Sequence, residues 1–245
     1  MNQKVSAILP TYNRIEFLKE SIQSIINQTY DNWELIIVDD NSNDGTKEYC
    51  QQLILEDKLD RIKYIRLYEN TGCVSIPRNI GLSYSTGEFI CNIDDDVISL
   101  SNKFELLVNE LNKDDEVLIS YGDRINVYQI LNNKEEYISC PNWNPLESWG
   151  VDNGQYMYKS KVYDLVEMNY VFPTHMCDWE LAKKICEIFP LIGYINQPVC
   201  KYIWHSSNRS LDKEKRTKPI YPSKFLKYFN PIFKNTNLKD FTNDL

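Results

Sequence analysis

Short apolar runs alternate with amphipathic helical patterns over residues 5–98 of the chain. The runs are rich in Ile, Val and Leu and are bounded by polar or turn residues, which is typical of buried strands. They span residues 5–9, 33–38, 62–66 and 89–93. Helical spacing of apolar residues predicts helices after Asn13, after the loop 42–45 and over about 75–84. This alternation with short connections predicts a parallel sheet, wound right-handedly, with helices on its faces.

Local signals refine the predicted elements of this first half. Pro10 is expected to end the first strand, because its nitrogen has no hydrogen to donate to a strand ladder. Asn13, with Glu16 three residues later, has the form of a capping box, so Asn13 is expected to cap the following helix. Asp40 is expected to play a structural role, in which its carboxylate accepts the backbone N–H groups of residues 42–43.

The pattern changes after residue 100, where strands and helices no longer alternate regularly. The predicted elements are a helix over 104–111, strands over 117–121 and 125–128, a helix over 178–189 and a strand over 199–204. A turn at Gly122 and Asp123 is expected between the two adjacent strands. No linker, repeat or low-complexity segment divides the chain. We therefore expect one domain with two functional halves, 1–98 and 99–220, followed by a tail over 221–245.

The composition is that of an ordinary globular protein with an acidic balance. The 245 residues are 42% hydrophobic and 25% charged, and the net charge is −8, which argues against a nucleic acid partner. The seven cysteines are scattered and form no CxxC pair, so neither a zinc site nor a disulfide framework is expected. The chain opens directly into a strand, without an apolar targeting segment. We expect a cytoplasmic protein in a reducing compartment.

Three consecutive carboxylates, Asp94, Asp95 and Asp96, follow the predicted strand 89–93. A second acidic pair ends the strand 33–38, so both groups are expected at the same carboxyl edge of the sheet, where open α/β sheets bind ligands. Clustered carboxylates repel one another and are costly to desolvate unless a cation or a hydrogen-bond donor satisfies them. A divalent cation carrying a phosphorylated ligand would satisfy them. The alternative is an acidic surface turn.

Four blocks, taken in order and at these intervals, resemble the family 2 inverting glycosyltransferases of GT-A fold. They are residues 5–14 (VSAILPTYNR), 34–42 (ELIIVDDNS), 78–81 (RNIG) and 93–96 (IDDD). The resemblance implies an α/β fold with a Rossmann-like, mostly parallel wound sheet, helices on both faces and a single domain. The last block resembles the DxD motif. It implies a nucleotide-sugar donor, with UDP as the expected nucleotide, and a Mn²⁺ or Mg²⁺ ion.

The resemblance also assigns donor-site roles to residues of this sequence. Asp96 is the expected metal ligand, Asp94 contacts the ribose or the metal shell, and Asp95, the middle position of this donor-binding triplet, points elsewhere. Asp39 is expected to accept a hydrogen bond from the base. Arg78 reaches the base or the phosphates, with an ion pair to an Asp at the same sheet edge as the alternative. The floor and side of the nucleotide pocket are assigned to Pro10, Thr11, Tyr12 and Arg14.

The second half of the chain must supply a general base. In a single displacement, one carboxylate takes the proton of the acceptor hydroxyl on the face opposite the leaving group. The family carries an acidic pair near the start of a helix that reads Glu-Asp-x-Glu-Leu, and residues 177–181 (CDWEL) resemble it. Asp178 fits the base position, while Cys177 replaces the preceding acid. The alternative for Asp178 is a structural role at the helix N-terminus.

Two further segments carry candidate site residues. Residues 202–210 (YIWHSSNRS) resemble the family's late strand and loop, and His205 is assigned to the metal shell or the diphosphate. The alternative for His205 is a hydrogen-bonded structural role. An acceptor loop is expected around residues 143–154, where Trp rings stack on sugars and Asp or Asn bind hydroxyls; ordinary loop packing is the alternative. The acceptor candidates are Trp143, Trp149, Asp152 and Asn153.

Together these assignments predict a metal-dependent inverting glycosyltransferase that acts on a hydroxyl of a carbohydrate or glycolipid acceptor. Two rivals stay open: a nucleotidyltransferase, and a non-catalytic nucleotide-sugar-binding module, for which Cys177 leaves room. The C-terminal tail is basic and aromatic from Lys213 onward. Such a segment can contact an anionic membrane peripherally, and packing against the domain is the alternative.

Overall fold

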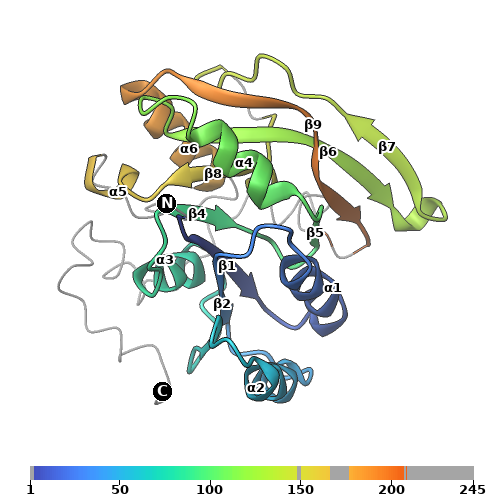
Figure 1. Cartoon of the computed structure of the whole chain (residues 1–245). Coiled ribbons are helices and arrows are strands. Elements are labelled where there is room, and N and C mark those ends of the chain that lie inside the picture. The colour runs from blue at the N-terminus through green and yellow to red at the C-terminus, as the bar shows by residue number, and fades with distance from the viewer. Residues whose placement is uncertain (1–2, 148–149, 166–176, 207, 209–245) are drawn as a thin grey trace.

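The computed structural model describes residues 3–147, 150–165, 177–206 and 208, with the backbone alone described at 130, 164–165 and 177–178 (Figure 1). The strands are β1 (Val5–Thr11), β2 (Trp33–Asp39), β3 (Ile62–Arg66), β4 (Phe89–Asn92), β5 (Val97–Ser99), β6 (Ile119–Tyr128), β7 (Lys134–Ile138), β8 (Tyr156–Lys159) and β9 (Ile192–Trp204). The helices are α1 (Ile15–Ile26), α2 (Thr46–Glu56), α3 (Ser75–Ser83), α4 (Lys103–Leu111), α5 (Val162–Leu165) and α6 (Cys177–Ile188), with short 3-10 turns η1 (Gln129–Leu131) and η2 (Asn153–Gln155).

One sheet runs through both halves of the chain, so the described residues form a single α/β domain. Its strand order is β3-β2-β1-β4-β8-β6-β9-β5, and β7 pairs with β6. The strands β1 to β4 are parallel to one another, and β6 is parallel to β9. The strands β5, β7 and β8 are antiparallel to their neighbours. The sheet is therefore mostly parallel, as the sequence predicts.

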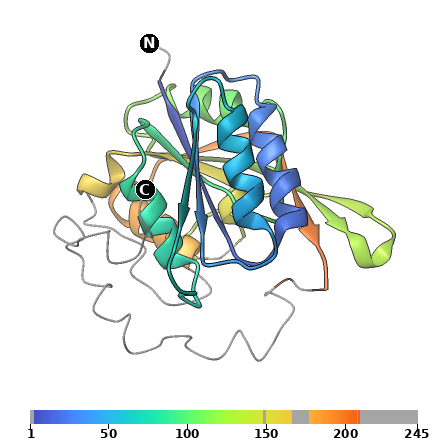
Figure 2. The same cartoon turned by 90° about the horizontal axis from the view of Figure 1, so that it is seen from below.

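Helices cover both faces of the first strands. Ile37 of β2 packs in the same cluster as Ile22 of α1, whereas Val38 of β2 packs with Ile80 of α3. Successive strand residues point to opposite faces, so these two clusters lie on the two sides of the sheet. Figure 2 shows α3 on one side of β1 to β3, and α1 and α2 on the other. Gly81 allows α3 to approach closely, because a Cβ there would collide with a side chain of β1.

The first strand does not end at Pro10, as expected, but continues to Thr11. Pro10 is the register partner of Val38 in β2. The pairing of β1 with β4 stops two residues earlier, at Ile8 and Asn92. Because β4 has already ended, the missing N–H of Pro10 costs no hydrogen bond on that side, which is where a strand tolerates proline.

The expectation that Asn13 caps α1 is wrong. The helix begins at Ile15, whose N–H donates to Asp44 Oδ2 at 2.9 Å. Asn13 has a φ of 51°, in the left-handed region that Asn tolerates, and its side-chain oxygen accepts the N–H of Asn43 at 2.8 Å. Asp44, in the loop after β2, therefore caps α1. The contacts of Asp44 and Asn13 join this loop to the loop between β1 and α1.

The predicted turn at Gly122 and Asp123 is also wrong, because β6 is one continuous strand of 10 residues. Its register with β9 shifts at these two residues. A Cβ at Gly122 would come within 2.5 Å of Val199, so glycine permits a close strand approach here and not a turn. Asp123 is fully buried and accepts hydrogen bonds from the Cys140 N–H at 2.8 Å and the Tyr194 hydroxyl at 2.9 Å.

The late elements follow the sequence prediction with shifted bounds. The helix α6 begins at Cys177, one residue before its expected start, and β9 begins at Ile192, seven residues before residue 199. Within the residues described, no helix has both the length and the apolar character needed to cross a bilayer. The expected tail over 221–245 lies outside the described residues.

Candidate functional site

The acidic groups meet at the carboxyl edge of the parallel strands, as the sequence predicts. Thr11 is the last residue of β1 and pairs in register with Asp39, the last residue of β2. Asp94 comes two residues after the end of β4, and the chain then enters β5. Because these three strands are parallel and adjacent, their ends bring the carboxylates of two distant segments to one edge.

Arg14, directly before α1, joins two carboxylates of the triplet. Its Nη1 lies 3.0 Å from Asp95 Oδ1 and 3.2 Å from Asp96 Oδ2. The Thr11 hydroxyl donates to Asp95 Oδ2 at 3.0 Å. Burial raises the pKa of Asp95 above its ordinary value, although the positive charge of Arg14 acts in the opposite direction. Asp95 therefore lies against two residues of the predicted nucleotide pocket.

Three side chains converge on Asp96, which is buried. Asn208 Nδ2 donates to Asp96 Oδ2 at 3.0 Å, and His205 Nε2 lies 3.4 Å from the same oxygen that Arg14 contacts. Asn208 also accepts the backbone N–H of His205, and the Phe17 ring stacks on the imidazole with 4.1 Å between ring centroids. The resemblance of residues 202–210 includes Asn208, but the sequence assigned it no role. Its spacing of three residues from His205, after a strand, is the signal that could have found it.

Arg78 of α3 is buried and forms an ion pair with Asp94. This is the alternative that the sequence left open for Arg78. When the amide oxygen of Asn153 is turned toward Arg78, it accepts hydrogen bonds from all three guanidinium nitrogens of Arg78 at 2.8 to 3.1 Å. The Asn153 nitrogen then donates to the Tyr156 hydroxyl at 2.7 Å. The predicted acceptor residue Asn153 and the predicted donor residue Arg78 are therefore direct neighbours.

Asp152 brings a fourth carboxylate to this edge. It pairs with Arg124 of β6 and caps η2 by accepting the N–H of Gln155. Burial raises the pKa of Asp152, Arg124 opposes this rise, and the charges of Asp94 and Asp96 add to it. The charges of Asp94 and Asp96 thus act on Asp152 across the site. The structure unites residues 152–153 with the triplet in one site.

Asp39 is fully buried, and three groups of the protein donate hydrogen bonds to its carboxylate. The N–H of Ser42 donates to Oδ1 at 2.7 Å, while the Tyr64 hydroxyl and Arg66 Nη1 bind Oδ2 at 2.6 and 2.8 Å. Burial, together with the negative charge of Asp39, raises the pKa of Tyr64. The sequence analysis missed Tyr64 and Arg66, although their spacing of two in a strand places both on one face.

The expected partners of Asp40 are wrong, because the Ser42 N–H binds Asp39 instead. Asp40 accepts the N–H and the hydroxyl of Thr71 at 2.9 and 3.1 Å, and the amide of Asn70 at 2.8 Å. It therefore does have a structural role, which is to hold the loop before α3 against the end of β2. Burial raises the pKa of Asp40 to about 7, against the pull of the hydrogen bonds from Thr71.

The raised pKa of Asp40 predicts how stability depends on pH. The folded protein holds this proton more tightly than the unfolded chain, so the contribution is complete below pH 3.8 and is lost as the pH rises toward about 7. The unfolding free energy should fall by at most about 1.4 kcal/mol per pH unit in this window. In urea unfolding at several pH values, Asp40→Asn should show a smaller fall than the wild type, and the remainder comes from Asp95, whose pKa burial also raises. Asp31→Asn, at an exposed site, should keep the full fall. Parallel curves for the wild type and Asp40→Asn would contradict the assignment.

The remaining predicted site residues are placed as follows. Tyr12 follows β1 and is 44% exposed beside the acidic edge, whereas Pro10 lies within β1. Trp143 is no acceptor residue, because it lies in the core, stacked on Tyr156 at 6.4 Å between ring centroids. Trp149 lies outside the described residues. Asp178 lies in the first turn of α6, and only its backbone is described.

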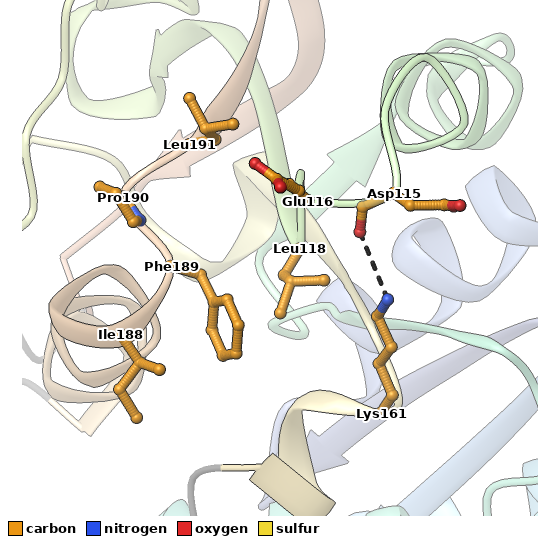
Figure 3. Close-up of a pocket in the computed structure, with 8 residues that line it drawn as sticks. All are labelled: Asp115, Glu116, Leu118, Lys161, Ile188, Phe189, Pro190 and Leu191. Atoms are coloured by element: carbon orange, nitrogen blue, oxygen red, sulfur yellow. Dashed lines mark hydrogen bonds between the residues drawn. The ribbon is translucent and has the colours of Figure 1, made fainter.

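A cavity of about 460 Å³ lies away from this edge (Figure 3). Leu118, Phe189 and Leu191 contribute apolar walls, and the Lys161 ammonium donates to the Asp115 carbonyl at 3.3 Å on its rim. All of its lining residues except Lys161, which follows β8, come shortly before β6 or β9, so the cavity lies at the amino ends of these parallel strands. It is therefore separate from the acidic site at the carboxyl ends.

The residues at the acidic edge fit a divalent cation only in part. Within the described ranges, no three His, Cys, Asp or Glu side chains come together as a metal site. Asp96 and His205 nevertheless place a carboxylate oxygen and an imidazole nitrogen 3.4 Å apart, and Mn²⁺ accepts both kinds of ligand. Mg²⁺ is commonly held by one or two carboxylates together with substrate phosphates. The pair therefore suits a cation that a phosphorylated ligand helps to bind.

A wound, mostly parallel sheet with acidic side chains at its carboxyl edge defines an α/β fold, and comparison with solved structures identifies it as GT-A. The chain superimposes on S. aureus TarS in complex with UDP-GlcNAc with a TM-score of 0.69 and 18% identity, covering 84% of this chain and 60% of that one. A mannosyltransferase, PcManGT from Pyrobaculum calidifontis, in complex with GDP-Man and Mn²⁺, gives 0.68 and 17% identity, covering 94% and 68%.

Sequence comparison identifies the family. Residues 6–163 match glycosyl transferase family 2, and the chain belongs to that family. A relative from Escherichia coli, the UDP-Glc:alpha-D-GlcNAc-diphosphoundecaprenol beta-1,3-glucosyltransferase WfgD, is 36% identical over 129 residues, or 53% of this chain and 47% of the relative. The match thus spans less than half the length of that relative, and less than half of the Streptococcus pneumoniae glycosyltransferase GlyG.

Proposed function

We propose that this protein is an inverting glycosyltransferase that requires Mn²⁺ or Mg²⁺ and takes its sugar from a nucleoside diphosphate, with UDP as the expected nucleotide. The observation that carries the proposal is the convergence of His205 and Arg14 on the buried carboxylate of Asp96, beside Asp94 at the carboxyl edge of the sheet. Asp96 and His205 would hold the cation. When bound, the cation neutralises the diphosphate and favours its departure.

The side chains around the triplet suit a nucleoside diphosphate. Asp39 keeps lone pairs that its three donors do not use, and these can accept an N–H from the base. Pro10, Thr11 and the half-exposed ring of Tyr12 border this position. Two neighbouring proteins of the same fold were solved with UDP-GlcNAc and with GDP-Man and Mn²⁺, which supports this class of donor.

Two arginines are placed to receive the diphosphate. Arg14 already bonds Asp95 and Asp96, and Arg78 already bonds Asp94. A guanidinium that moves from a carboxylate to a phosphate exchanges one anionic partner for another, so the move adds little desolvation. Binding of the cation would release Arg14 from Asp96 for this exchange.

The transfer step requires one base and no covalent intermediate. The acceptor oxygen forms a bond to the anomeric carbon as the bond from that carbon to the diphosphate oxygen breaks, which inverts the configuration. Asp178 receives the hydroxyl proton. It lies in the first turn of α6, and Cys177 before it leaves a single carboxylate for this role.

The acceptor is proposed to be a carbohydrate or a glycolipid. Asp152 and Asn153, which contact Arg124 and Arg78, border the donor site on the side of the second half of the chain. Trp149 belongs to the same loop in sequence. Relatives from E. coli and Campylobacter jejuni are named for acceptors linked to undecaprenol through a diphosphate, which supports a glycolipid and a peripheral membrane contact.

A donor screen tests the proposal. UDP-, GDP- and dTDP-sugars are incubated with the full chain, with Mn²⁺ or with EDTA, and release of the nucleoside diphosphate is measured. We expect slow hydrolysis of at least one UDP-sugar that EDTA abolishes, because water replaces the acceptor. Release of pyrophosphate from a nucleoside triphosphate would instead favour a nucleotidyltransferase. Metal-dependent UDP binding without any hydrolysis would favour a non-catalytic module.

A further inference from the structure

A row of side chains leads away from Asp152 along the paired strands β6 and β9. In register, Arg124 faces Cys200, Asn126 faces Tyr202 and Tyr128 faces Trp204; residues two apart in a strand share a face of the sheet. Arg124 forms an ion pair with Asp152, whose pKa the charges of Asp94 and Asp96 raise. The row therefore begins at the donor site and continues toward the β6–β7 hairpin at the edge of the molecule (Figure 1).

The polar members of this row are linked by hydrogen bonds. Arg124 Nε donates to Asn126 Oδ1 at 3.0 Å, and Asn126 Nδ2 donates to the Tyr128 oxygen at 3.2 Å. The Tyr128 hydroxyl donates to Glu136 of β7 at 2.7 Å. These bonds fix each side chain before any ligand arrives. Adjacent members are two residues apart, or roughly 6.6 Å along a strand.

Aromatic rings lie beside the polar row at its far end. Tyr128 and Trp204 stack with 6.0 Å between centroids and an angle of 22°, and Tyr202 meets Trp204 edge-on at 5.4 Å. Both stacked residues are partly exposed. Within the part of the chain that the structure describes, Trp204 Nε1 is buried without a hydrogen-bond partner. A buried donor of this kind is costly unless a ligand or another group accepts its hydrogen.

We propose that Tyr128 and Trp204 form a platform for a pyranose ring of the acceptor, next to the sugar that receives the transferred residue. The apolar face of a pyranose stacks on the aromatic rings, one hydroxyl accepts the Trp204 N–H, and another donates to Glu136. This inference rests on the proposed function and makes it more specific: the acceptor carries at least two sugar rings. The continuity with Asp152 places the platform on the acceptor side of the donor site.

The chemistry of the row favours a sugar over other ligands. Donors and acceptors alternate along it, and the aromatic surface is confined to its end. A membrane surface would instead require a cluster of cations, and a protein partner a broader apolar patch. A sugar presents both an apolar face and hydroxyls that donate and accept, which matches this combination.

The test follows the indole N–H signals of the full chain by NMR in the presence of UDP and Mg²⁺, which is diamagnetic and does not broaden the signals. Trp204→Phe identifies the Trp204 signal, and Trp33, which is 2% exposed in the core, is the internal control. Cellobiose and chitobiose are the probes. We expect at least one to shift the Trp204 signal saturably and to leave Trp33 unchanged. Tyr128→Ala should weaken this binding about tenfold, and Tyr128→Phe, which keeps the ring, should largely preserve it.

Two results would overturn the platform: a Trp204 signal that neither disaccharide moves, or a shift that persists unchanged in Tyr128→Ala. Calorimetry of UDP with Mg²⁺ on the same wild-type sample separates this inference from the proposed function. Absence of UDP binding counts against the function. UDP binding without a Trp204 response counts against the platform alone.

Discussion

Replacing Asp96 with alanine is expected to lower the affinity for UDP in the presence of Mn²⁺ at least ~100-fold. The physical reason is that Asp96 is the buried carboxylate on which His205 and Arg14 converge. Among the described residues, no cluster of three His, Cys, Asp or Glu side chains offers the cation another site. Calorimetric titration measures the effect. Without metal, the wild type and the variant should bind UDP equally weakly, because the lost interaction is the one made through the cation.

The matched control removes the same charge at the opposite edge of the sheet. Asp115→Ala truncates a fully exposed carboxylate beside the cavity and should leave the metal-dependent affinity unchanged. Asp96→Asn provides a second control, because its amide oxygen can still accept the hydrogen bond from Asn208 and preserve the loop after β9. We expect it to lose metal-dependent binding as well. Wild-type affinity in Asp96→Ala would remove the metal assignment.

Replacing Asp178 with asparagine should lower the transfer rate about 1,000-fold while UDP binding with Mn²⁺ stays intact. An amide cannot take the proton of the acceptor hydroxyl, but it has nearly the shape of the carboxylate. In the first turn of α6, asparagine loses only the interaction of the charge with the helix dipole, about 0.3–1 kcal/mol, so α6 should stay folded. Asp178→Asn therefore distinguishes a role of Asp178 as general base from a structural role at the N-terminus of α6. Single-turnover transfer and calorimetry on the same protein measure the two effects.

Glu180→Gln is the control for Asp178→Asn. It makes the same chemical change in the same first part of α6, two residues later, and should keep most of the activity. Undiminished turnover in Asp178→Asn would refute the base. Equal losses in both variants would point instead to the electrostatics of the helix terminus, to which both carboxylates contribute.

The first half of the fold could be predicted because its determinants are local. The apolar runs of β1 to β4 and the helical spacing of α1 are periodic within a few residues, and parallel strands buried on both faces are apolar almost throughout. The failures depend on partners far away in the sequence. Asp44 caps α1 across a separate loop, and Gly122 adapts to Val199, so neither contact has a local signature.

The same distinction separates the predicted and missed parts of the site. Asp94 and Asp96 follow a strand end, so topology predicted their place at the carboxyl edge, whereas His205 was assigned through the resemblance of residues 202–210. The sequence left two alternatives open for Arg78, an ion pair with an Asp or a contact with the nucleotide, because a guanidinium can pair with a carboxylate or a phosphate. The structure shows the ion pair, with Asp94. Asn208 was given no role, since an asparagine in a polar loop is common and only its contact with Asp96 distinguishes it.

A crystal structure of the full chain with Mn²⁺ and UDP tests the central claim most directly. The account predicts a cation at coordination distance from Asp96, with the diphosphate as its other ligand and Arg14 moved away from Asp96 toward the phosphates. A nucleotide bound elsewhere, or a triplet that keeps its bonds to Arg14 and Arg78 without a cation beside it, would contradict the account.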